Sequence, residues 1–329
     1  MNFQNKNIVI TGANGLVGIP TVKKCLAEGA KVVYAVDINI GQELRSLAEA
    51  HPDRLLIKPA DLTYLHNCEN LFLGTNVNIV LHLAGIKGSP TRAKNQPADY
   101  LFPMMMFNTN IIKASFDAKV DWFVYTSSVG VYAPADVMIE DSVWSTMPSV
   151  NDWHPGWAKR MGELAIDSLR IQHGWTKWTV IRPANIYGEN DNFSPEATVI
   201  AANIWKINHL TSNRLSCWGD GSARRDFVFS DDVANAVINC VKGEINDTIN
   251  FGCGEPVTIK ETIETLVDLF HESTGRDVDI MWDISKPNGD SLRCLDSTQQ
   301  RKYGILPTTS LRAGIKQTLA TYLKNDKSK

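Results

Sequence analysis

Short runs of apolar residues recur along the first half of the chain, and stretches with helical spacing of apolar residues separate them. Runs of this length, bounded by turn residues, are typical of strands that are buried on both faces. The predicted strands lie at residues 7–11, 31–36, 54–59, 79–84, 122–126 and 180–182. Predicted helices fill the intervals, for example at 17–28 and 104–119. This alternation predicts an α/β fold with a doubly wound parallel sheet.

The regular pattern loosens after the sixth predicted strand. Loops rich in Asn, Asp, Gly and Pro occur at 188–195, 219–223 and 287–290 and alternate with short helices and strands. We therefore expect a dinucleotide-binding domain over residues 1–180 and a smaller C-terminal substrate lobe over 181–329. A predicted helix at 230–242 indicates that a segment near 228–250 returns to the main sheet.

A glycine-rich turn links the first predicted strand to the first predicted helix. Its residues are Gly12-Ala13-Asn14-Gly15-Leu16-Val17-Gly18. Gly12 permits a tight turn, Gly15 lets the backbone approach a pyrophosphate, and Gly18 lets the helix pack closely on the strand. The helix N-terminus offers free N–H groups to phosphates. The sequence therefore predicts a Rossmann-type dinucleotide site with these contacts: Gly12, Asn14, Gly15, Leu16, Val17 and Gly18.

Acidic residues after the next two strands refine this prediction. Asp37 ends the second strand, about 20 residues after the turn, where a carboxylate can bind the adenosine ribose and would repel a 2′-phosphate. No arginine stands beside it, so the pattern favours NAD over NADP. Asp61 and Leu62 follow the third strand and are candidates for adenine contacts. Asp61 could equally be the N-cap of the next helix, with Thr63 beside it.

Composition limits the other classes of function. The formal net charge of -3 gives no basic excess for nucleic acid, and no apolar run is long enough to span a bilayer. Six cysteines are scattered without a CxxC pair, and the histidines do not cluster with them, so we expect reduced thiols and no metal. The first residues show no signal-peptide pattern, and we expect a cytoplasmic protein.

Further motifs resemble those of a known family. They are Asp61-Leu62, His82-Leu83-Ala84-Gly85, Ser127 to Tyr132, Ala158 to Glu163, Arg182 to Gly188, Trp218 to Gly221, Arg225-Asp226-Phe227 and Asp231-Asp232-Val233. Together with the glycine turn they are similar to the extended short-chain dehydrogenase/reductases that act on nucleotide sugars. Segments 185–193 and 286–289 are most similar to the GDP-fucose synthases. The resemblance implies a nucleotide-diphosphate sugar as substrate, a role in polysaccharide biosynthesis, a homodimer, and cofactor contacts from Leu83, Ala84, Gly85 and Lys159.

That family carries out proton transfer with a Tyr and a Lys four residues later on one helix face, and a Ser orients the substrate oxygen. The resemblance places Ser128 and Lys159 at the Ser and Lys positions. Pro155, which has no ionisable group, stands where the Tyr belongs. Other family positions also differ: the supporting Asn falls at Met104, the Cys of fucose synthases at Gly130, and their catalytic His near Thr198. The fucose-synthase reaction is therefore not carried over.

Three interpretations of Pro155 remain open. His154 could be the replacement acid, with Pro155 as the first residue of a helix, and Asp152 and Tyr132 are weaker candidates. The chemistry could instead proceed without the Tyr, with Lys159 as base. The third interpretation is a catalytically silent protein that binds NAD and a nucleotide sugar. We expect an NAD-dependent epimerase, dehydratase or oxidoreductase on a GDP- or UDP-sugar, and keep the silent binder as the alternative.

Candidate substrate contacts come from both halves of the chain. Arg225 can make bidentate contacts to a diphosphate, and Asn185 can bind the diphosphate or the sugar. By position in the resemblance, Lys206 and Arg293 are further candidates. Trp218 could stack on the base, although we favour core packing. After the fourth strand, the candidates are Lys87, Ser89 and Arg92. Helices near 104–119 and 156–172 resemble the family's dimer pair, and the run 104–107 could belong to an interface or to the core.

Overall fold

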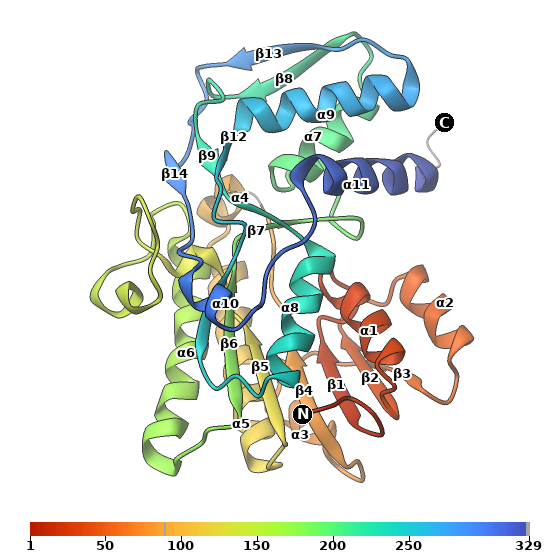
Figure 1. Ribbon diagram of the computed structural model, residues 1–329, viewed down its shortest axis with the longest axis vertical. Coiled ribbons are helices and arrows are strands. Elements are labelled where there is room, and N and C mark those ends of the chain that lie inside the picture. The colour runs from red at the N-terminus through yellow and green to blue at the C-terminus, as the bar shows by residue number, and fades with distance from the viewer. Residues whose placement is uncertain (89, 327–329) are drawn as a thin grey trace.

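Seven parallel strands form the centre of the protein (Figure 1), whose computed structural model describes residues 1–88 and 90–326. In spatial order the strands are β11 (Thr248–Phe251), β6 (Trp178–Pro183), β5 (Trp122–Thr126), β4 (Val77–His82), β1 (Asn7–Thr11), β2 (Val32–Asp37) and β3 (Leu55–Pro59). The order reverses between β1 and β4, and ligands of such sheets bind at the carboxyl edge beside this point. The predicted fold class is confirmed.

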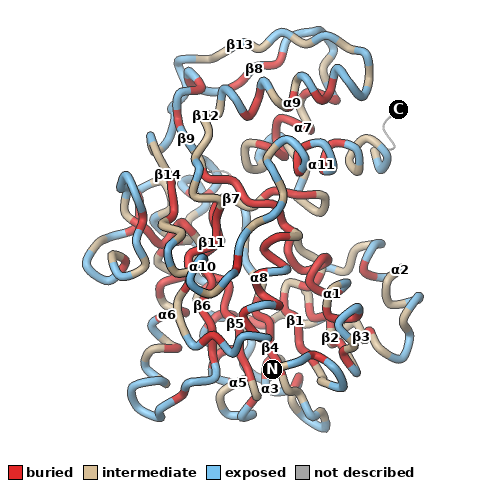
Figure 2. Tube along the Cα trace, viewed as in Figure 1, coloured by how far each residue is buried: buried red, intermediate tan, exposed pale blue. Residues whose placement is uncertain are grey.

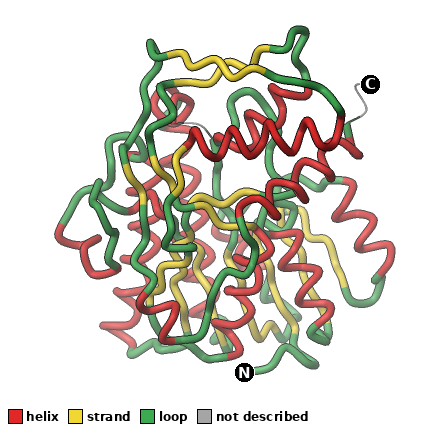
Figure 3. The backbone as a smooth tube through the Cα atoms, turned by 45° about the horizontal axis from the view of Figure 1, so that its top comes forward, coloured by secondary structure: helices red, strands yellow, loops and turns green. Residues whose placement is uncertain are grey.

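Helices cover both faces of this sheet, as Figure 3 shows. One layer contains α1 (Gly18–Ala27), α2 (Gln42–Ala50) and α8 (Ser230–Lys242), and the other contains α3 (Leu65–Asn70), α5 (Ala98–Asp117) and α6 (Trp153–His173). Side chains along β1 alternate between the layers: Ile8 and Ile10 join the first core, and Val9 joins the second. The central strands β5 and β6 are accordingly buried at every residue, and β1 and β4 at most of theirs (Figure 2).

Several predicted boundaries differ from the structure, and two of these differences lie beside the cavity. The fourth strand ends at His82 rather than at residue 84, because the chain leaves the sheet there to line a cavity. Helix α5 begins at Ala98, whereas the sequence predicted a start at 104, and Pro103 cannot donate a helical hydrogen bond at its position. Pro103 is therefore an internal proline of α5, and it lies beside the same cavity.

A smaller lobe with its own core stands above the carboxyl edge of the sheet (Figure 1). Its helices are α7 (Val199–Asn208), α9 (Ile259–Thr274) and α11 (Leu311–Asn325). Its short strands are β7 (Asn185–Tyr187) with β10 (Phe227–Phe229), β8 (Arg214–Trp218) with β13 (Asp279–Asp283), and β9 (Arg224–Arg225) with β12 (Val257–Thr258) and β14 (Leu292–Arg293). The remaining elements are α4 (Pro90–Asn95), α10 (Thr298–Lys302), and the 3₁₀ helices η1 (Val129–Val131) and η2 (Glu140–Ser145).

The chain passes back to the sheet after it has entered the smaller lobe. Helix α8 packs on α1, and β11 pairs with β6 at the edge of the sheet. Leu295 and Ile305 also belong to the first core, a return that the sequence analysis did not predict. We propose the division into residues 1–180 and 181–329, with a returning segment near 228–250, as the domain organisation.

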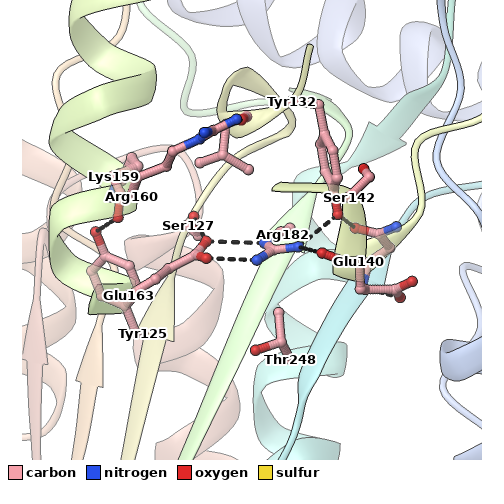
Figure 4. Close-up of polar contacts among 12 residues, drawn as sticks. Tyr125, Ser127, Tyr132, Glu140, Ser142, Lys159, Arg160, Glu163, Arg182 and Thr248 are labelled. Atoms are coloured by element: carbon pink, nitrogen blue, oxygen red, sulfur yellow. Dashed lines mark hydrogen bonds and ion pairs between the residues drawn. The ribbon is translucent and has the colours of Figure 1, made fainter. Parts of the chain in front are cut away.

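A buried ion pair fixes α6 against the sheet (Figure 4). Arg182 on β6 donates two parallel hydrogen bonds to Glu163 on α6, Nε to Oε1 at 3.0 Å and Nη2 to Oε2 at 2.6 Å. The two side chains are 2% and 4% exposed. Burial alone would lower the pKa of the Arg182 guanidinium, but the charge and hydrogen bonds of Glu163, together with Tyr132, raise it. Arg182 is therefore a permanent cation inside the protein.

Neighbouring groups complete the environment of this ion pair. Ser127 Oγ, at the end of β5, donates to Glu163 Oε1. Arg182 Nη1 donates to Tyr132 Oη and to the Glu140 carbonyl oxygen, both at 2.8 Å. Figure 4 shows Arg182 between Glu163 on one side and Tyr132 with Glu140 on the other. The pair therefore joins α6, two strands and the loop that carries η2.

We expect Glu163→Ala to lower the free energy of unfolding by about 3–5 kcal/mol, because it leaves the Arg182 charge buried without a carboxylate. Urea denaturation of both proteins at neutral pH measures the difference. Lys242→Ala is the matched control, since it removes the exposed Lys242–Glu28 pair and should cost less than about 1 kcal/mol. Similar losses from the two variants would contradict a structural role for the buried pair.

Candidate functional site

A cavity of about 1380 Å³ lies between the carboxyl edge of the sheet and the smaller lobe. Nearly all of the residues predicted from the sequence line it. On the sheet side these are Gly12, Asn14, Gly15, Leu16, Val17, Gly18, Asp37, Asp61, Leu62, Leu83, Ala84, Gly85, Lys87, Ser128 and Lys159. On the lobe side they are Asn185, Lys206, Trp218, Arg225 and Arg293. The structure thus brings residues from almost the whole chain to one cavity.

The glycine turn is packed so tightly that side chains are excluded from it. Gly12 has φ +69°, and a Cβ there would approach the backbone of Ala84 at 2.8 Å. A Cβ on Gly18 would overlap the carbonyl oxygen of Gly12. Helix α1 therefore begins directly against the end of β1, beside the cavity that Gly15, Leu16, Val17 and Gly18 line. This cradle fits the pyrophosphate of a dinucleotide.

Asp37 and Asn14 form the adjoining wall of the cavity. The Asp37 carboxylate accepts hydrogen bonds from the backbone N–H of Asn14 and of Asn39, both at 3.0 Å. Asn14 Oδ1 in turn accepts from the Gly41 N–H at 3.0 Å. These bonds hold the carboxylate at the edge of the glycine turn. Each carboxylate oxygen has two lone pairs, so Asp37 retains capacity for ribose hydroxyls.

Asp61 is not a helix cap. Its Oδ1 accepts from both the backbone N–H and the hydroxyl of Thr63, at 2.9 and 2.7 Å, while the N-cap of α3 is Tyr64. The N-cap interpretation is therefore wrong, because the side chain closes a local turn before the helix begins. Asn110 on α5 donates to the Leu62 and Thr63 carbonyl oxygens and anchors this turn beside the cavity.

Lys159 lies at the floor of the cavity between the ends of β4 and β5. Its Nζ donates to the Thr126 carbonyl at 2.7 Å and to the Ala84 carbonyl at 3.2 Å. The ammonium also stands 5.1 Å from the centroid of the Tyr125 ring. Burial lowers the pKa of Lys159 to about 7, although the Glu163 carboxylate opposes the shift. This amine therefore changes charge near neutral pH.

His82 and Asn108 support the helix that carries this lysine, and the sequence analysis did not single them out. His82 Nε2 lies 2.9 Å from Asn108 Oδ1, and Asn108 Nδ2 donates to the Ala158 carbonyl. Because an amide oxygen only accepts, Nε2 must donate, and Nδ1 then accepts from the Thr11 hydroxyl at 2.6 Å. Burial and the Lys159 charge lower the pKa of His82 to about 3, so the ring is neutral.

The helical position of Asn108 explains why it was missed. Family spacing pointed to Met104, which is buried and lines the cavity but has no polar group. Asn108 lies one turn farther along α5 and faces α6 instead. The sequence offered one signal for Asn108, which is a polar Asn among the apolar residues on one face of the helix.

The structure separates the candidates for the missing tyrosine. Helix α6 begins at Trp153, so Pro155 is its third residue rather than its first, and there too a helix requires no N–H donor. Pro155 and Asp152 line the cavity, but His154 is not among the lining residues. Tyr132 is 1% exposed and hydrogen-bonds Asn250 and Arg182. The predictions that His154 or Tyr132 serves as the acid are not supported by this arrangement.

Several predicted substrate contacts are engaged by protein groups. Lys87 Nζ pairs with the Asp191 carboxylate at 2.7 Å and also donates to the Ile186 carbonyl. Asn185 Nδ2 donates to the Asp226 carbonyl at 2.8 Å. Lys206 lines the cavity from α7. Arg92 lies nearby on α4, whereas Ser89 lies outside the described residues.

Arg225 and Trp218 stand at the far end of the cavity. Arg225 Nη1 donates to the Asp290 and Arg224 carbonyl oxygens, and burial, together with the nearby Arg293 charge, lowers its pKa to about 10. The side chain of Trp218 is 49% exposed, with Lys286 Nζ 5.9 Å from its ring centroid. Core packing of Trp218 is therefore wrong, because the end of β8 turns this ring toward the opening.

The arrangement defines a long site with different chemistry at its two ends. One end has the glycine turn and Asp37, which suit a dinucleotide. The other end has an aromatic face and partly buried guanidinium groups, which suit a base and phosphates. Ser128 and Lys159 lie between them. Ser128 Oγ accepts from the Gly130 N–H at 3.0 Å, which leaves its hydroxyl hydrogen for another partner.

Two further findings concern the residues that the structure describes. No group of three or more His, Cys, Asp or Glu side chains among them could hold a metal ion. None of their helices combines the length and the apolar character needed to cross a membrane.

Known proteins match the chain over most of its length. Residues 8–252 match the family described as the NAD dependent epimerase/dehydratase family. GDP-L-fucose synthase 1 of Arabidopsis thaliana is 28% identical over 334 residues, which cover 99% of this chain and 95% of that protein. GDP-L-fucose synthase of Escherichia coli (strain K12) is 26% identical over 307 residues, which cover 87% and 94%.

A solved structure has the same fold. UDP-glucose 4-epimerase of Thermotoga maritima, determined with UDP-glucose, aligns with a TM-score of 0.81 at 24% identity. The alignment covers 97% of this chain and 99% of that one. Since the sheet and the smaller lobe are both included, the two chains share their whole architecture.

We expect Lys159→Met to remove a pH dependence of stability between pH 7 and 10.5. In this window the unfolded chain binds a proton that the folded protein does not, so the unfolding free energy of the wild type should rise with pH relative to that of the variant. The slope is at most about 1.4 kcal/mol per pH unit. Denaturation at a series of pH values measures it.

The exposed Lys31 provides the control for this experiment. Lys31→Met makes the same change of side chain at the surface, and its difference from the wild type should stay flat over the window. A flat difference for Lys159→Met as well would contradict the low pKa of the buried amine.

Proposed function

Because the chain belongs to the NAD dependent epimerase/dehydratase family, we propose that it is an NAD-dependent enzyme that modifies a nucleotide sugar. The reaction is of the epimerase, dehydratase or oxidoreductase type, on a GDP- or UDP-sugar, and the active site is atypical because Pro155 stands where a tyrosine is expected. One observation carries the proposal: a single cavity joins the glycine turn, the buried Lys159 amine and the Arg225–Trp218 end.

The sheet side of the cavity supports NAD as the cofactor. Residues 12–18 would hold the pyrophosphate, and Asp37 would accept hydrogen bonds from the adenosine ribose and repel a 2′-phosphate. Leu83, Ala84 and Gly85 would line the nicotinamide half, beside Lys159. When bound, the nicotinamide supplies a hydride acceptor or donor. Asp61 and Leu62 remain proposed neighbours of the adenine.

The lobe side supports a nucleotide-diphosphate sugar. Arg225 has a partly buried guanidinium that donates to two carbonyl oxygens, and a diphosphate would compensate its charge better. Trp218 offers a flat apolar face to a nucleobase. Lys206 and Asn185 would contact the diphosphate or the sugar from the same side. The sugar would then lie over Ser128, which is placed to orient a hydroxyl group.

The catalytically silent alternative has one observation in its favour. The side chain one turn before Lys159 is Pro155, which cannot transfer a proton. Loss of a general acid or base slows such chemistry by about 10²–10⁴-fold. A protein with this change could still bind both ligands.

We expect the protein, supplied with NAD, to convert at least one GDP- or UDP-sugar. Absorbance at about 340 nm detects net hydride transfer, and chromatography of the sugar detects redox-neutral products. Lys159→Met should slow conversion by about 10²-fold or more, because it removes the amine at the floor of the site. Lys31→Met should retain the wild-type rate. Binding without conversion across GDP-, UDP-, dTDP- and CDP-sugars would favour the silent alternative.

We also propose that the protein is a cytoplasmic homodimer. All six cysteines are free thiols, which is usual in a reducing compartment. Helices α5 and α6 pack together, and their outer surfaces expose apolar side chains: Phe102, Met106, Leu164 and Ile171. Met104 and Phe107 are buried, so the run 104–107 contributes to both the core and this surface. Exposed apolar stripes of this kind mark association surfaces.

Ile171→Glu should shift the protein from dimer to monomer, because the charge would be buried in the proposed interface. Sedimentation velocity at matched concentrations measures the change. Ile284→Glu is the control, since Ile284 is exposed in the smaller lobe away from the helix pair. A monomeric wild type, or an unchanged dimer in the Ile171 variant, would contradict the interface.

A further inference from the structure

Arg293 connects the smaller lobe to the start of α6. It extends from β14 between two carboxylates, Asp152 at the N-cap of α6 and Asp290 in the preceding loop. Its side chain is 12% exposed, and Nη2 lies 2.6 Å from Asp290 Oδ2. A cation that was predicted to bind phosphate is therefore already paired with two protein carboxylates.

The two carboxylates differ in how far their hydrogen-bonding capacity is used. Asp290 accepts from Ser149 Oγ at 2.9 Å, from Asn151 Nδ2 at 2.6 Å and from Arg293 Nε at 3.0 Å. Asp152 pairs with Arg293 Nη2 through its buried Oδ2, which leaves its Oδ1 as the carboxylate oxygen available to another donor. Asp290 therefore accepts hydrogen bonds within the protein, whereas Asp152 can still accept one from a ligand in the cavity.

Gly130 places Asp152 beside the serine of the site. A Cβ built on Gly130 would lie 3.4 Å from Ser128 Oγ, 3.4 Å from Asp152 Cβ and 3.5 Å from Asp152 Cγ. The hydroxyl and the carboxyl group thus flank the same point on the cavity wall, and the glycine leaves that point open. Both residues line the cavity, as does Pro155. A sugar hydroxyl bound to Ser128 would lie next to the Asp152 carboxylate.

We propose that Asp152 is the catalytic residue that exchanges a proton with the sugar hydroxyl oriented by Ser128. In the oxidising direction, the O–H bond breaks and its proton passes to the Asp152 carboxylate. The hydrogen on the same carbon would leave with both electrons of its C–H bond, as hydride, for which a bound oxidised nicotinamide would be the acceptor, and a C=O bond would form. In the reducing direction the protonated carboxyl returns the proton to the alkoxide oxygen. The inference rests on the proposed function.

The other charged groups near Asp152 hold it in place. Arg293 contacts it directly, Asp290 shares that arginine, and Arg225 interacts with it electrostatically. Arg293 is a positioning residue in this scheme, because it fixes the carboxylate against the end of α6. Pro155 supports the same arrangement, since it leaves the space beside Lys159 without a competing acid.

The test compares the wild type with Asp152→Asn, which keeps the shape and cannot take up the proton. We expect kcat to fall by about 10²–10⁴-fold while KM changes by less than about 3-fold. Calorimetric titration with the nucleotide sugar alone, without cofactor, should give a nearly unchanged Kd. The wild type should lose activity toward low pH, where the catalytic carboxylate is protonated. This loss should be absent from the pH profile of Asp152→Asn. Asp152→Ser serves if the Asn variant does not fold.

A tyrosine introduced at position 155 tests whether Asp152 carries a proton or only supports the structure. Adding Pro155→Tyr to Asp152→Asn should raise kcat by about 10-fold or more, because a tyrosine one turn before Lys159 can carry the proton instead. An active wild type with an equally active Asn variant would overturn this inference alone. Parallel losses of binding and rate, or no rescue by the tyrosine, would also overturn it. A wild type that binds sugars without turnover would overturn both this inference and the proposed function.

Discussion

The buried Arg182–Glu163 pair is the interaction on which the arrangement of the site depends. Glu163 lies one turn beyond Lys159 on α6, and Arg182 lies at the end of β6, so the pair determines how the helix sits on the sheet. Neither charge could remain at this depth without the other. Because Ser127 and Tyr132 bond to the same pair, the segment with Ser128 and Gly130 is fixed by it as well.

The cavity is completed from the opposite side by segments distant in sequence. Arg293 reaches Asp152 across the cavity, and Lys87 reaches Asp191. Both contacts join the sheet side to the smaller lobe at the edges of the same space. The glycine turn lines one part of this cavity, and Asp152 and Pro155 line the wall that also carries Lys159.

The fold and the dinucleotide half of the site could be predicted because their signals are local. The glycine turn and Asp37 follow directly from strands whose apolar runs are visible in the sequence. Trp218 could not be placed in this way, since its exposure depends on how β8 ends against distant segments. His154 was favoured over Asp152 because it stands next to Pro155 and an imidazole suits general acid–base work. In the structure α6 begins at Trp153, and Asp152 rather than His154 lines the cavity.

The neutral ring of His82 has a consequence for how the protein responds to acidity. With a pKa of about 3, His82 keeps one tautomer and the same hydrogen bonds to Thr11 and Asn108 over the whole physiological pH range. Lys159, one residue from the carbonyl that Asn108 holds, gains or loses its charge near pH 7. A change of pH therefore alters the charge at the cavity floor, while the hydrogen bonds that join β1, β4, α5 and α6 beneath it stay the same.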